Sequence, residues 1–243
     1  MRRLAALCLS LLALGGPAAA ACRDARFEGK GFTICEVALG EDLRIFHQGA
    51  DGRPLRSFER VNDQLAGETA RLGFAMNAGM YHSDRSPVGL LIEQGEELAP
   101  LVTSDGPGNF GLLPNGVFCI GERFAVIESR NFAENRPNCR YATQSGPMLV
   151  IDGALHPRFL PDSPSRYIRN GVGVSPDGSR AYFVISQDRV NFTEFGRFFR
   201  DALQTPQALY FDGNVSRLYA PQIGRDDIGF PMGPMVGTVI PNG

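Results

Sequence analysis

The chain has 243 residues, of which 43% are hydrophobic and 21% are charged. This balance excludes a disordered or fibrous chain, and the length suits one large domain. The formal net charge of −2 argues against a basic nucleic-acid-binding protein and against a polybasic protein of the membrane surface. Lys30 is the only lysine, so nearly all cations are arginines. A GC-rich genome explains this bias, and so does anion binding, and composition does not separate the two.

The first twenty residues have the pattern of a secretory signal peptide. Arg2 and Arg3 precede an apolar run over residues 4–15, and small residues at 18–20 offer a cleavage site. The run is too short to span a membrane. We predict a signal peptide at 1–20 and an exported mature domain at 21–243, periplasmic or secreted and not inserted in the membrane. Cys22 after three alanines also permits a lipoprotein, but the usual large aliphatic residue before it is missing.

Four cysteines remain after Cys8 is lost with the signal peptide. An even number in an oxidising compartment indicates disulfides, and four cysteines allow three pairings. We favour the two local loops, Cys22–Cys35 and Cys119–Cys139. A metal site or a reactive thiol is the alternative, but no CxxC spacing supports it.

The hydrophobic pattern predicts many short strands and about two longer helices. Strands are expected at residues 31–38, 43–47, 73–76, 88–92, 124–127, 148–151, 171–174, 181–185 and 208–211. The turn at 176–178 marks the pair 171–174 and 181–185 as a hairpin. One helix is expected at 57–71. A second begins after Asn191 or Thr193 as the N-cap and carries a phenylalanine face. The tail, with four prolines, is expected to be mostly irregular.

Regular alternation of strands and helices is absent, so a doubly wound sheet is not expected. The predicted fold class is α+β: a mixed, largely antiparallel sheet core with a few flanking helices in one domain. Several strands end in a Gly, Asn or Asp turn. Such turns place backbone amides and short polar side chains at a cleft, although each of them alone is more simply a tight turn.

Common catalytic arrangements are missing from the sequence. It has no G-x-S-x-G elbow, no H-E-x-x-H zinc pattern, no phosphate-binding P-loop and no G-x-G-x-x-G. The three histidines lie far apart, and the aspartates lack the spacing of a calcium loop. We therefore expect no metal and no cofactor, and no dinucleotide-dependent or nucleotide-hydrolysing chemistry.

Four short motifs remain, at residues 77–81 (NAGMY), 144–147 (QSGP), 169–173 (RNGVG) and 212–216 (DGNVS). In this order they resemble the phosphodiester glycosidase family, and the chain is similar to its shorter exported bacterial branch. The family pattern is roughly N-G/A-G-x-aromatic, Q-S/T-G-P, R-x-G/A-V/I-G and D-G-G-x-S. Asn214 departs from it, since many members have glycine there. A glycine lets a substrate approach the backbone closely, so this departure bears on the substrate more than on the fold.

The resemblance implies a hydrolase that cleaves the sugar–oxygen bond of a sugar-1-phosphodiester and releases free sugar and a phosphomonoester. A phosphate leaves as a stabilised anion and needs little help from a general acid. The developing oxocarbenium ion needs a carboxylate, and the phosphate needs fixed donors. We assign the carboxylate to Asp212, the phosphate contact to Arg169, and sugar or phosphate contacts to Asn77. Substrate-binding residues are expected at Gln144, Ser145, Gly146, Gly79, Asn170, Gly213, Asn214 and Ser216. For each of them a turn, ion-pair or loop role is the simpler alternative.

His82, Asp188 and Asn191 are second-tier candidates, Asp188 as a second carboxylate. Envelope or exopolysaccharide glycans are the expected substrates. Two other functions stay open: a non-catalytic protein that binds envelope glycans or sugar phosphates, and a hydrolase of another bond with Ser145 as nucleophile. The sugar, the stereochemical outcome and the oligomeric state do not follow from the sequence.

Overall fold

The computed structural model describes residues 20–242. Apart from Ala20, the predicted signal peptide lies outside these residues. Within the described residues no helix is long and apolar enough to cross a membrane. The strands form three sheets, every ladder of which is antiparallel, so the expected fold class is confirmed and its sheets contain no parallel pair.

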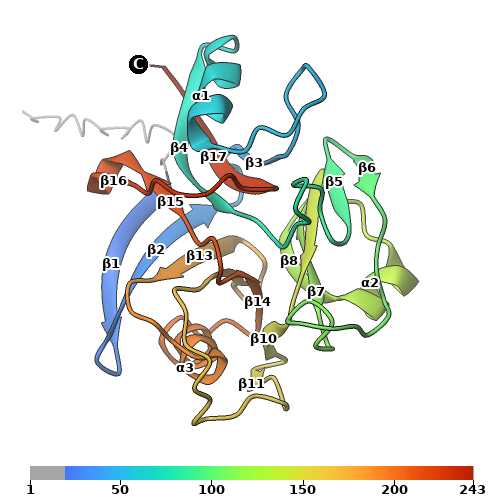
Figure 1. Cartoon of the computed structure of the whole chain (residues 1–243), viewed down its shortest axis with the longest axis vertical. Helices are drawn as coiled ribbons and strands as arrows, with labels where there is room; N and C mark the ends of the chain where they lie inside the picture. Colours follow the sequence, from blue (N-terminus) through green and yellow to red (C-terminus); the bar gives the residue numbers. More distant parts are fainter. Residues whose placement is uncertain (1–19, 243) are drawn as a thin grey trace, which may run out of the picture.

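The three sheets are named here I, II and III (Figure 1). Sheet I has the order β1 (Ala21–Phe27), β2 (Lys30–Ala38), β13 (Arg180–Ser186), β12 (Asn170–Val174), β14 (Gln207–Asp212), β10 (Met148–Ile151) and β11 (Ala154–Leu155). Sheet II has the order β16 (Arg225–Asp226), β15 (Leu218–Ala220), β4 (Ala70–Asn77), β17 (Met235–Pro241) and β3 (Leu43–Phe46). Sheet III has the order β6 (Glu96–Ala99), β5 (Leu91–Glu93), β9 (Tyr141–Ser145), β7 (Gly116–Ile120) and β8 (Phe124–Glu128).

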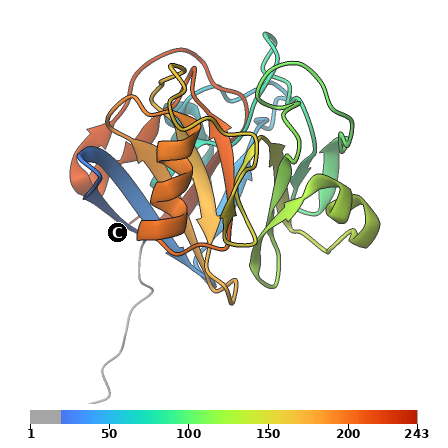
Figure 2. The same ribbon diagram turned by 90° about the horizontal axis from the view of Figure 1, so that it is seen from below.

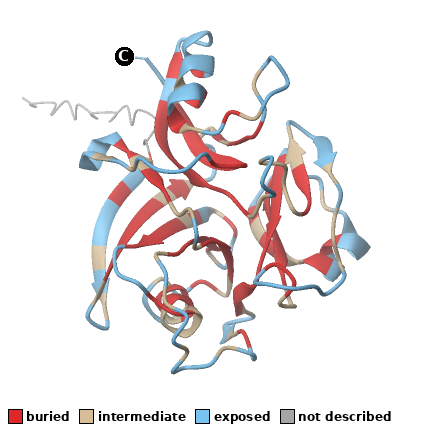
Figure 3. Ribbon diagram, in the orientation of Figure 1, coloured by how far each residue is buried: buried red, intermediate tan, exposed pale blue. Residues whose placement is uncertain are grey.

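The three sheets share one hydrophobic core. Val37 of sheet I, Phe74 of sheet II and Phe118 of sheet III belong to the same buried cluster. The rings of Phe74 and Phe118 both pack on Phe183 of β13, with centroids 5.3 and 5.6 Å away. Figure 3 shows the buried residues gathered on the strands that face this centre, while β1 is largely exposed at the edge. The site described below lies where strands of all three sheets end.

Two helices cover the outer faces, and their starts follow local capping rules. Ser57 caps α1 (Phe58–Ala66), because its Oγ accepts a hydrogen bond from the Arg60 amide. Asn191 and Glu194 form a reciprocal capping box at the start of α3 (Phe192–Arg197). The predicted cap at Asn191 is therefore confirmed.

The phenylalanine face of α3 covers one face of sheet I (Figure 2). The helix continues in a wider π-type turn (Phe198–Ala202). Phe195 and Phe199 are fully buried, and the Phe198 ring stacks on Phe32 of β2 with centroids 3.9 Å apart. This stripe is core packing, as its helical spacing suggested.

Both predicted disulfides are present. Cys22 and Cys35 lie directly opposite each other on β1 and β2, with Cα atoms 4.0 Å apart. Cys119 of β7 is bonded to Cys139, which precedes β9. The first bond joins two paired strands, and the second joins β7 to the segment that leads into its partner strand β9.

Three sequence-based expectations about secondary structure were wrong. The tail is not irregular, because β15, β16 and β17 are strands and β17 lies between β4 and β3 in sheet II. The helix expected at 57–71 ends at Ala66, and the chain turns through Thr69, whose φ is 54°, into β4. The strand expected at 88–92 begins only at Leu91. Strands β1, β7 and β9 and the short helix α2 (Ser129–Asn135) were not predicted. A 3₁₀ turn (Pro221–Ile223) links β15 to β16.

Candidate active site

The four motifs lie at strand ends that meet in space. Asn77 is the last residue of β4, Ser145 the last of β9, Asn170 the first of β12 and Asp212 the last of β14. These strands come from all three sheets. The turn residues that follow or precede them are therefore brought to one place by the tertiary structure.

A buried pair of asparagines joins sheet II to sheet I. Asn77 Nδ2 donates to Asn170 Oδ1 at 3.1 Å, and Asn170 Nδ2 donates to the Asn77 carbonyl at 2.8 Å. The Arg217 amide donates to Asn77 Oδ1 at 3.1 Å. Both side chains are completely buried. Their polar atoms are used within the protein, so the geometry gives Asn77 and Asn170 a role in positioning the strands that carry the site.

The last motif is held to this pair by Ser216. Its Oγ lies 3.2 Å from Asn170 Oδ1 and 3.0 Å from the carbonyl oxygens of both Asp212 and Ile168, so its single proton can be donated to any one of the three. Asp212 Oδ1 accepts hydrogen bonds from the amides of Gly213 and Asn214 at 2.6 and 2.8 Å. The turn thus closes on its own carboxylate and fixes the direction of Asp212.

The Gln144–Pro147 motif has a structural role in the geometry seen here. Gln144 accepts hydrogen bonds from the amides of Leu90 and Val102 and donates to Ser129 Oγ. Ser145 Oγ donates to the Phe211 carbonyl at 3.1 Å and so connects sheet III to β14. Neither side chain lines the pocket described next. Gly146 is packed so closely that an added Cβ would lie 2.6 Å from the Asn115 side chain.

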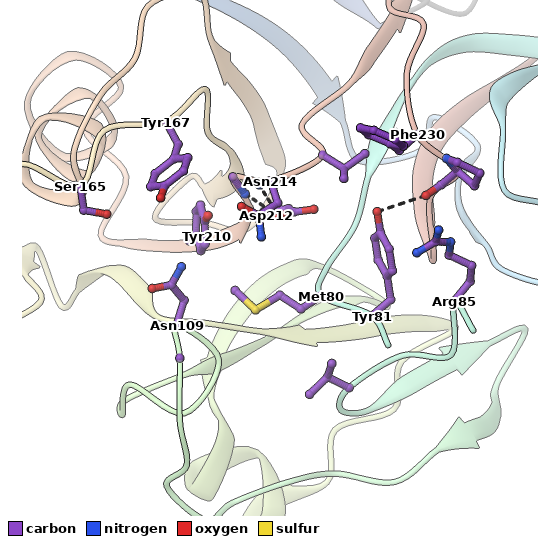
Figure 4. A pocket seen from close by; sticks show the side chains of 15 residues that line it. Met80, Tyr81, Arg85, Asn109, Ser165, Tyr167, Tyr210, Asp212, Asn214 and Phe230 are labelled. Atoms are coloured by element: carbon purple, nitrogen blue, oxygen red, sulfur yellow. Dashed lines mark hydrogen bonds between the residues drawn. The ribbon is translucent and has the colours of Figure 1, made fainter. Parts of the chain in front are cut away.

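A cavity of about 720 Å³ opens beside Asp212 (Figure 4). It is lined by Met80, Tyr81, Arg85, Val88, Gly108, Asn109, Ser165, Tyr167, Tyr210, Asp212, Gly213, Asn214, Val215, Phe230 and Pro231. Of these lining residues, Asp212 is the only carboxylate and Arg85 the only cation. The rest of the lining combines aromatic, amide and hydroxyl groups with the apolar side chains of Met80, Val88, Val215 and Pro231, which suits a mostly neutral ligand with one charged group.

Asp212 has the environment of a functional carboxylate. Only 8% of the residue is exposed, and burial raises the pKa of its carboxyl above the ordinary value, although the amides of Asn214 and Gly213 partly oppose the shift. A perturbed carboxylate that faces a cleft marks a candidate catalytic group. Burial also raises the pKa of Tyr210, which adjoins Asp212 in the pocket wall, so that hydroxyl stays protonated at neutral pH.

Arg169 lies behind the pocket wall and does not line the cavity. Its side chain is 1% exposed, its Nε donates to the Val190 carbonyl and its Nη2 to the Ser165 carbonyl. The guanidinium stacks on Phe192, with Cζ 3.9 Å from the ring centroid, and lies 5.3 Å from that of Tyr210. Its Nη1 has no hydrogen-bond partner among the described residues. In this geometry Arg169 acts on the pocket through Ser165 and Tyr210, and burial lowers its pKa.

The second-tier candidates lie outside the pocket. Asp188 is exposed and its Oδ2 accepts a hydrogen bond from the Gly31 amide at 2.7 Å. His82 is exposed on the turn before Ser86. Asn191 is the cap of α3 and donates to the carbonyl of Pro161. The structure therefore assembles no pair of carboxylates from Asp188 and Asp212.

The comparison with known proteins decides the family. Residues 70–228 match the family model of phosphodiester glycosidases, a span that contains all four motifs. The chain belongs to the phosphodiester glycosidase family. The resemblance seen in the motifs is thereby confirmed, and this phosphodiester glycosidase is a hydrolase. Strands β1, β2, β3 and β17 lie outside the matched span, yet they complete sheets I and II around it.

Two further similarities cover most of the glycosidase chain. The uncharacterized protein YigE of Escherichia coli strain K12 is 32% identical over 216 residues, which is 88% of this chain and 83% of YigE. The zebrafish catalytic domain of N-acetylglucosamine-1-phosphodiester α-N-acetylglucosaminidase, auto-inhibited by its pro-peptide, has a similar structure, with a TM-score of 0.59. The likeness covers 89% of this chain and 81% of the zebrafish domain at 12% identity, so it shows the fold alone.

Sequence reasoning missed much of the pocket lining of this phosphodiester glycosidase. Arg85, Asn109, Ser165, Tyr167 and Phe230 come from loops between strands, where no periodic pattern marks a residue as facing a cavity. For Tyr81 and Tyr210, the sequence did contain a signal that could have placed them in the pocket wall. Tyr81 closes the first motif, and Tyr210 precedes Asp212 by two residues on β14, so both side chains of that strand point to the same face.

Proposed function

We propose that this phosphodiester glycosidase hydrolyses the sugar–oxygen bond of a sugar-1-phosphodiester. Water supplies a hydroxyl group to the anomeric carbon, and the bond from that carbon to the bridging oxygen breaks. The bridging oxygen leaves with its electron pair on the phosphomonoester, and the remaining proton of the water passes to the phosphate or to solvent. The observation that supports the proposal is Asp212: a buried carboxylate with a raised pKa, held by its own turn, beside a cavity of sugar-phosphate size.

A single carboxylate fits this leaving group. Most glycosidases use two carboxyl groups, one of which protonates the departing oxygen. A phosphate leaves as a stabilised anion and does not need that proton. Among the described residues, Asp212 is the only carboxylate that lines the pocket. Asp212 would stabilise the positive charge that develops on the sugar, attack it, or activate water, each of which requires its ionised form.

The aromatic and hydroxyl groups of the pocket suit a sugar. Tyr167 and Tyr210 offer flat faces and hydroxyl groups, and Asn109 and Ser165 offer further donors and acceptors. Arg169 supports this wall from behind with a positive charge. The serine-nucleophile alternative has no support in the geometry, because Ser145 Oγ is buried, bonded to the Phe211 carbonyl and outside the pocket lining.

We further propose that the protein acts outside the cytoplasm on envelope or exopolysaccharide glycans. The support is the signal-peptide pattern at residues 1–20 together with the two disulfides, which persist in oxidising compartments. Fractionation of cells that express the full chain would test export, with the size of the mature protein giving the cleavage point.

The test of activity is proton and phosphorus NMR of the protein with a methyl phosphodiester of N-acetylglucosamine 1-phosphate and with UDP-N-acetylglucosamine. Free sugar and a phosphomonoester are expected. Asp212→Asn should abolish turnover while the protein stays folded, and full activity in this variant would overturn the assignment. Sugar 1-phosphate as the product would indicate cleavage of the other ester bond. Binding without turnover by the wild-type protein would favour the non-catalytic glycan-binding function.

A further inference from the structure

The charge distribution of the pocket singles out Arg85, a residue outside all four motifs. It is half-buried, and it is the only cation among the residues that line the cavity. Among the described residues, no carboxylate lies within 4.0 Å of its guanidinium, so Arg85 has no ion pair there. A half-buried cation without a counter-ion, facing a cleft, is available to an anionic ligand.

The local turn explains why Arg85 is unpaired. Its neighbour in sequence, Asp84, is turned away: Asp84 Oδ1 accepts hydrogen bonds from both the amide and the Oγ of Ser86, at 2.9 and 2.7 Å. These bonds hold the pKa of Asp84 below its usual value. Arg85 itself has a φ of 80°, a conformation rarely adopted by residues other than glycine. The turn is closed by the hydrogen bond from the His82 amide to the Ser86 carbonyl.

Tyr81 provides a platform for the guanidinium. The Cζ of Arg85 lies 5.4 Å from the centroid of the Tyr81 ring, within the range of a cation–π interaction. Tyr81 is fixed in turn, because its hydroxyl donates to the Pro231 carbonyl at 3.3 Å. Burial raises the pKa of Tyr81 to about 12, so the ring beneath Arg85 carries no charge that could neutralise it at physiological pH.

Two backbone donors next to Asp212 are already used. The amides of Gly213 and Asn214 bind Asp212 Oδ1 and are not free to form an anion hole. Arg169 is enclosed by carbonyl groups and aromatic rings behind the wall. Figure 4 shows Arg85 and Tyr81 on one side of Asp212, and Tyr167 and Ser165 on the other. The two ends of the pocket therefore differ, one cationic and one lined by neutral hydroxyl groups.

We infer that Arg85 binds the phosphoryl group of the substrate. The phosphodiester then lies at the Tyr81–Arg85 end of the pocket, the sugar at the Ser165–Tyr167 end, and the anomeric carbon beside Asp212. The identification of the ligand as a sugar phosphodiester rests on the proposed function. The recognition of a phosphoryl anion by Arg85 is independent of that function and can be tested alone.

The first experiment measures binding of inorganic phosphate and of neutral N-acetylglucosamine by NMR titration, in wild type, Arg85→Ala and Arg85→Lys. Arg71→Ala is the matched control, because Arg71 is an exposed arginine at the opposite end of β4 from Asn77 and has no ion pair among the described residues. Phosphate affinity should fall at least about tenfold in Arg85→Ala, as for loss of a charge-assisted hydrogen bond, and recover partly in Arg85→Lys. Neutral-sugar affinity should stay within about twofold.

The second experiment uses the methyl phosphodiester of N-acetylglucosamine 1-phosphate in the Asp212→Asn background, where turnover should be absent. Adding Arg85→Ala should weaken binding of the diester by at least the same factor as binding of phosphate. Unchanged affinity for both anions would overturn the inference. An equal loss of affinity for anions and for neutral sugar would also overturn it, since Arg85 would then only support the pocket wall. A wild-type protein that binds phosphate through Arg85 and hydrolyses no diester would overturn the proposed function but not the phosphoryl site.

Discussion

Asn170 and Asp212 are cross-strand partners at the open end of the β12–β14 ladder, and Asn170 is also bonded to Asn77 of sheet II. The register shifts between Asn170 and Gly171, so the ladder is distorted where the candidate carboxylate begins its turn. The position of Asp212 relative to sheet II thus depends on a buried amide pair that never touches the cavity. The motifs of this chain thus combine the Asp212 turn with the side chains that hold it.

The first prediction concerns the pH dependence of activity. Because burial raises the pKa of Asp212 and its ionised form is required, the acid limb of kcat/KM should lie above the usual aspartate pKa of about 3.9. Activity should fall about tenfold per pH unit below that limb. A pH–rate profile with the sugar phosphodiester measures it. Asp188→Asn is the matched control and should leave both the limb and the rate within about twofold, since Asp188 lies outside the pocket.

The second prediction concerns the effect of the same pKa shift on the stability of the fold. Since the folded-state pKa of Asp212 is higher than the unfolded-state value, the folded protein binds the proton more tightly. Asp212 therefore does not lower the free energy of unfolding at a pH below its pKa in the unfolded state. The loss of stability develops as the pH rises from that value through the pKa of the folded state. Asp212→Asn should be at least as stable as wild type at pH 7 in urea unfolding. A large loss of stability would mean that its hydrogen bonds to Gly213 and Asn214 outweigh its desolvation.

The third prediction concerns the buried asparagine pair. Asn170→Ala removes the partner of Asn77 Nδ2 and of the Asn77 carbonyl and leaves both buried without it. The free energy of unfolding should fall by about 2 kcal/mol or more, with loss of activity because the Asp212 turn is no longer held. Asn131→Ala on the exposed face of α2 is the control and should change stability by less than about 0.5 kcal/mol. Equal effects of the two substitutions would contradict the positioning role.

The fourth prediction tests the packing of the Asp212 turn against the pocket wall. A Cβ at Gly213 would lie 2.3 Å from the Tyr210 hydroxyl oxygen, so Gly213→Ala should displace Tyr210 and cost about 1–3 kcal/mol. Gly106→Ala is the control, because an added Cβ there meets nothing within 4 Å. Adding Tyr210→Phe removes the atom that clashes. The double variant should recover the melting temperature of the Tyr210→Phe single variant, and no recovery would show that the strain lies elsewhere.

The fifth prediction compares the two disulfides. Cys119 and Cys139 are 20 residues apart. Replacing both by alanine should destabilise the protein by about 3 kcal/mol, because the unfolded chain gains the conformational entropy that the closed loop had removed. Cys22 and Cys35 are 13 residues apart on a hairpin that their ladder already holds together. Their replacement should cost less. Urea unfolding of both double variants, with wild type under reducing conditions as reference, orders the two contributions.

The sequence predicted those features whose cause is local. Short apolar segments marked β2, β10 and β13 as strands, turn residues marked the β12–β13 hairpin, and capping chemistry marked the start of α3. The pairing of the cysteines was predicted from the short loops that separate them along the chain. The order of the four motifs, which include the Asp212 turn, also indicated the family.

The sequence could not predict features whose cause is distant in the chain. The four prolines of the tail led us to expect irregular structure, yet Val236 and Gly237 of β17 pair with β3 on one side and β4 on the other. Whether such a segment becomes a strand depends on partners that are distant in the chain.

Arg169 shows the same limit at the site. An arginine in a binding motif suggests a contact with the anion, but burial among Phe192, Tyr210 and two carbonyl groups places this one behind the wall. Arg85 lies outside every motif and lines the cavity, while its neighbour Asp84 is hydrogen-bonded to Ser86. The sequence by itself determined the chemistry of the family and its local elements. Only the tertiary structure decided which charges line the cavity, because burial and hydrogen-bond competition are set by residues far apart in the chain.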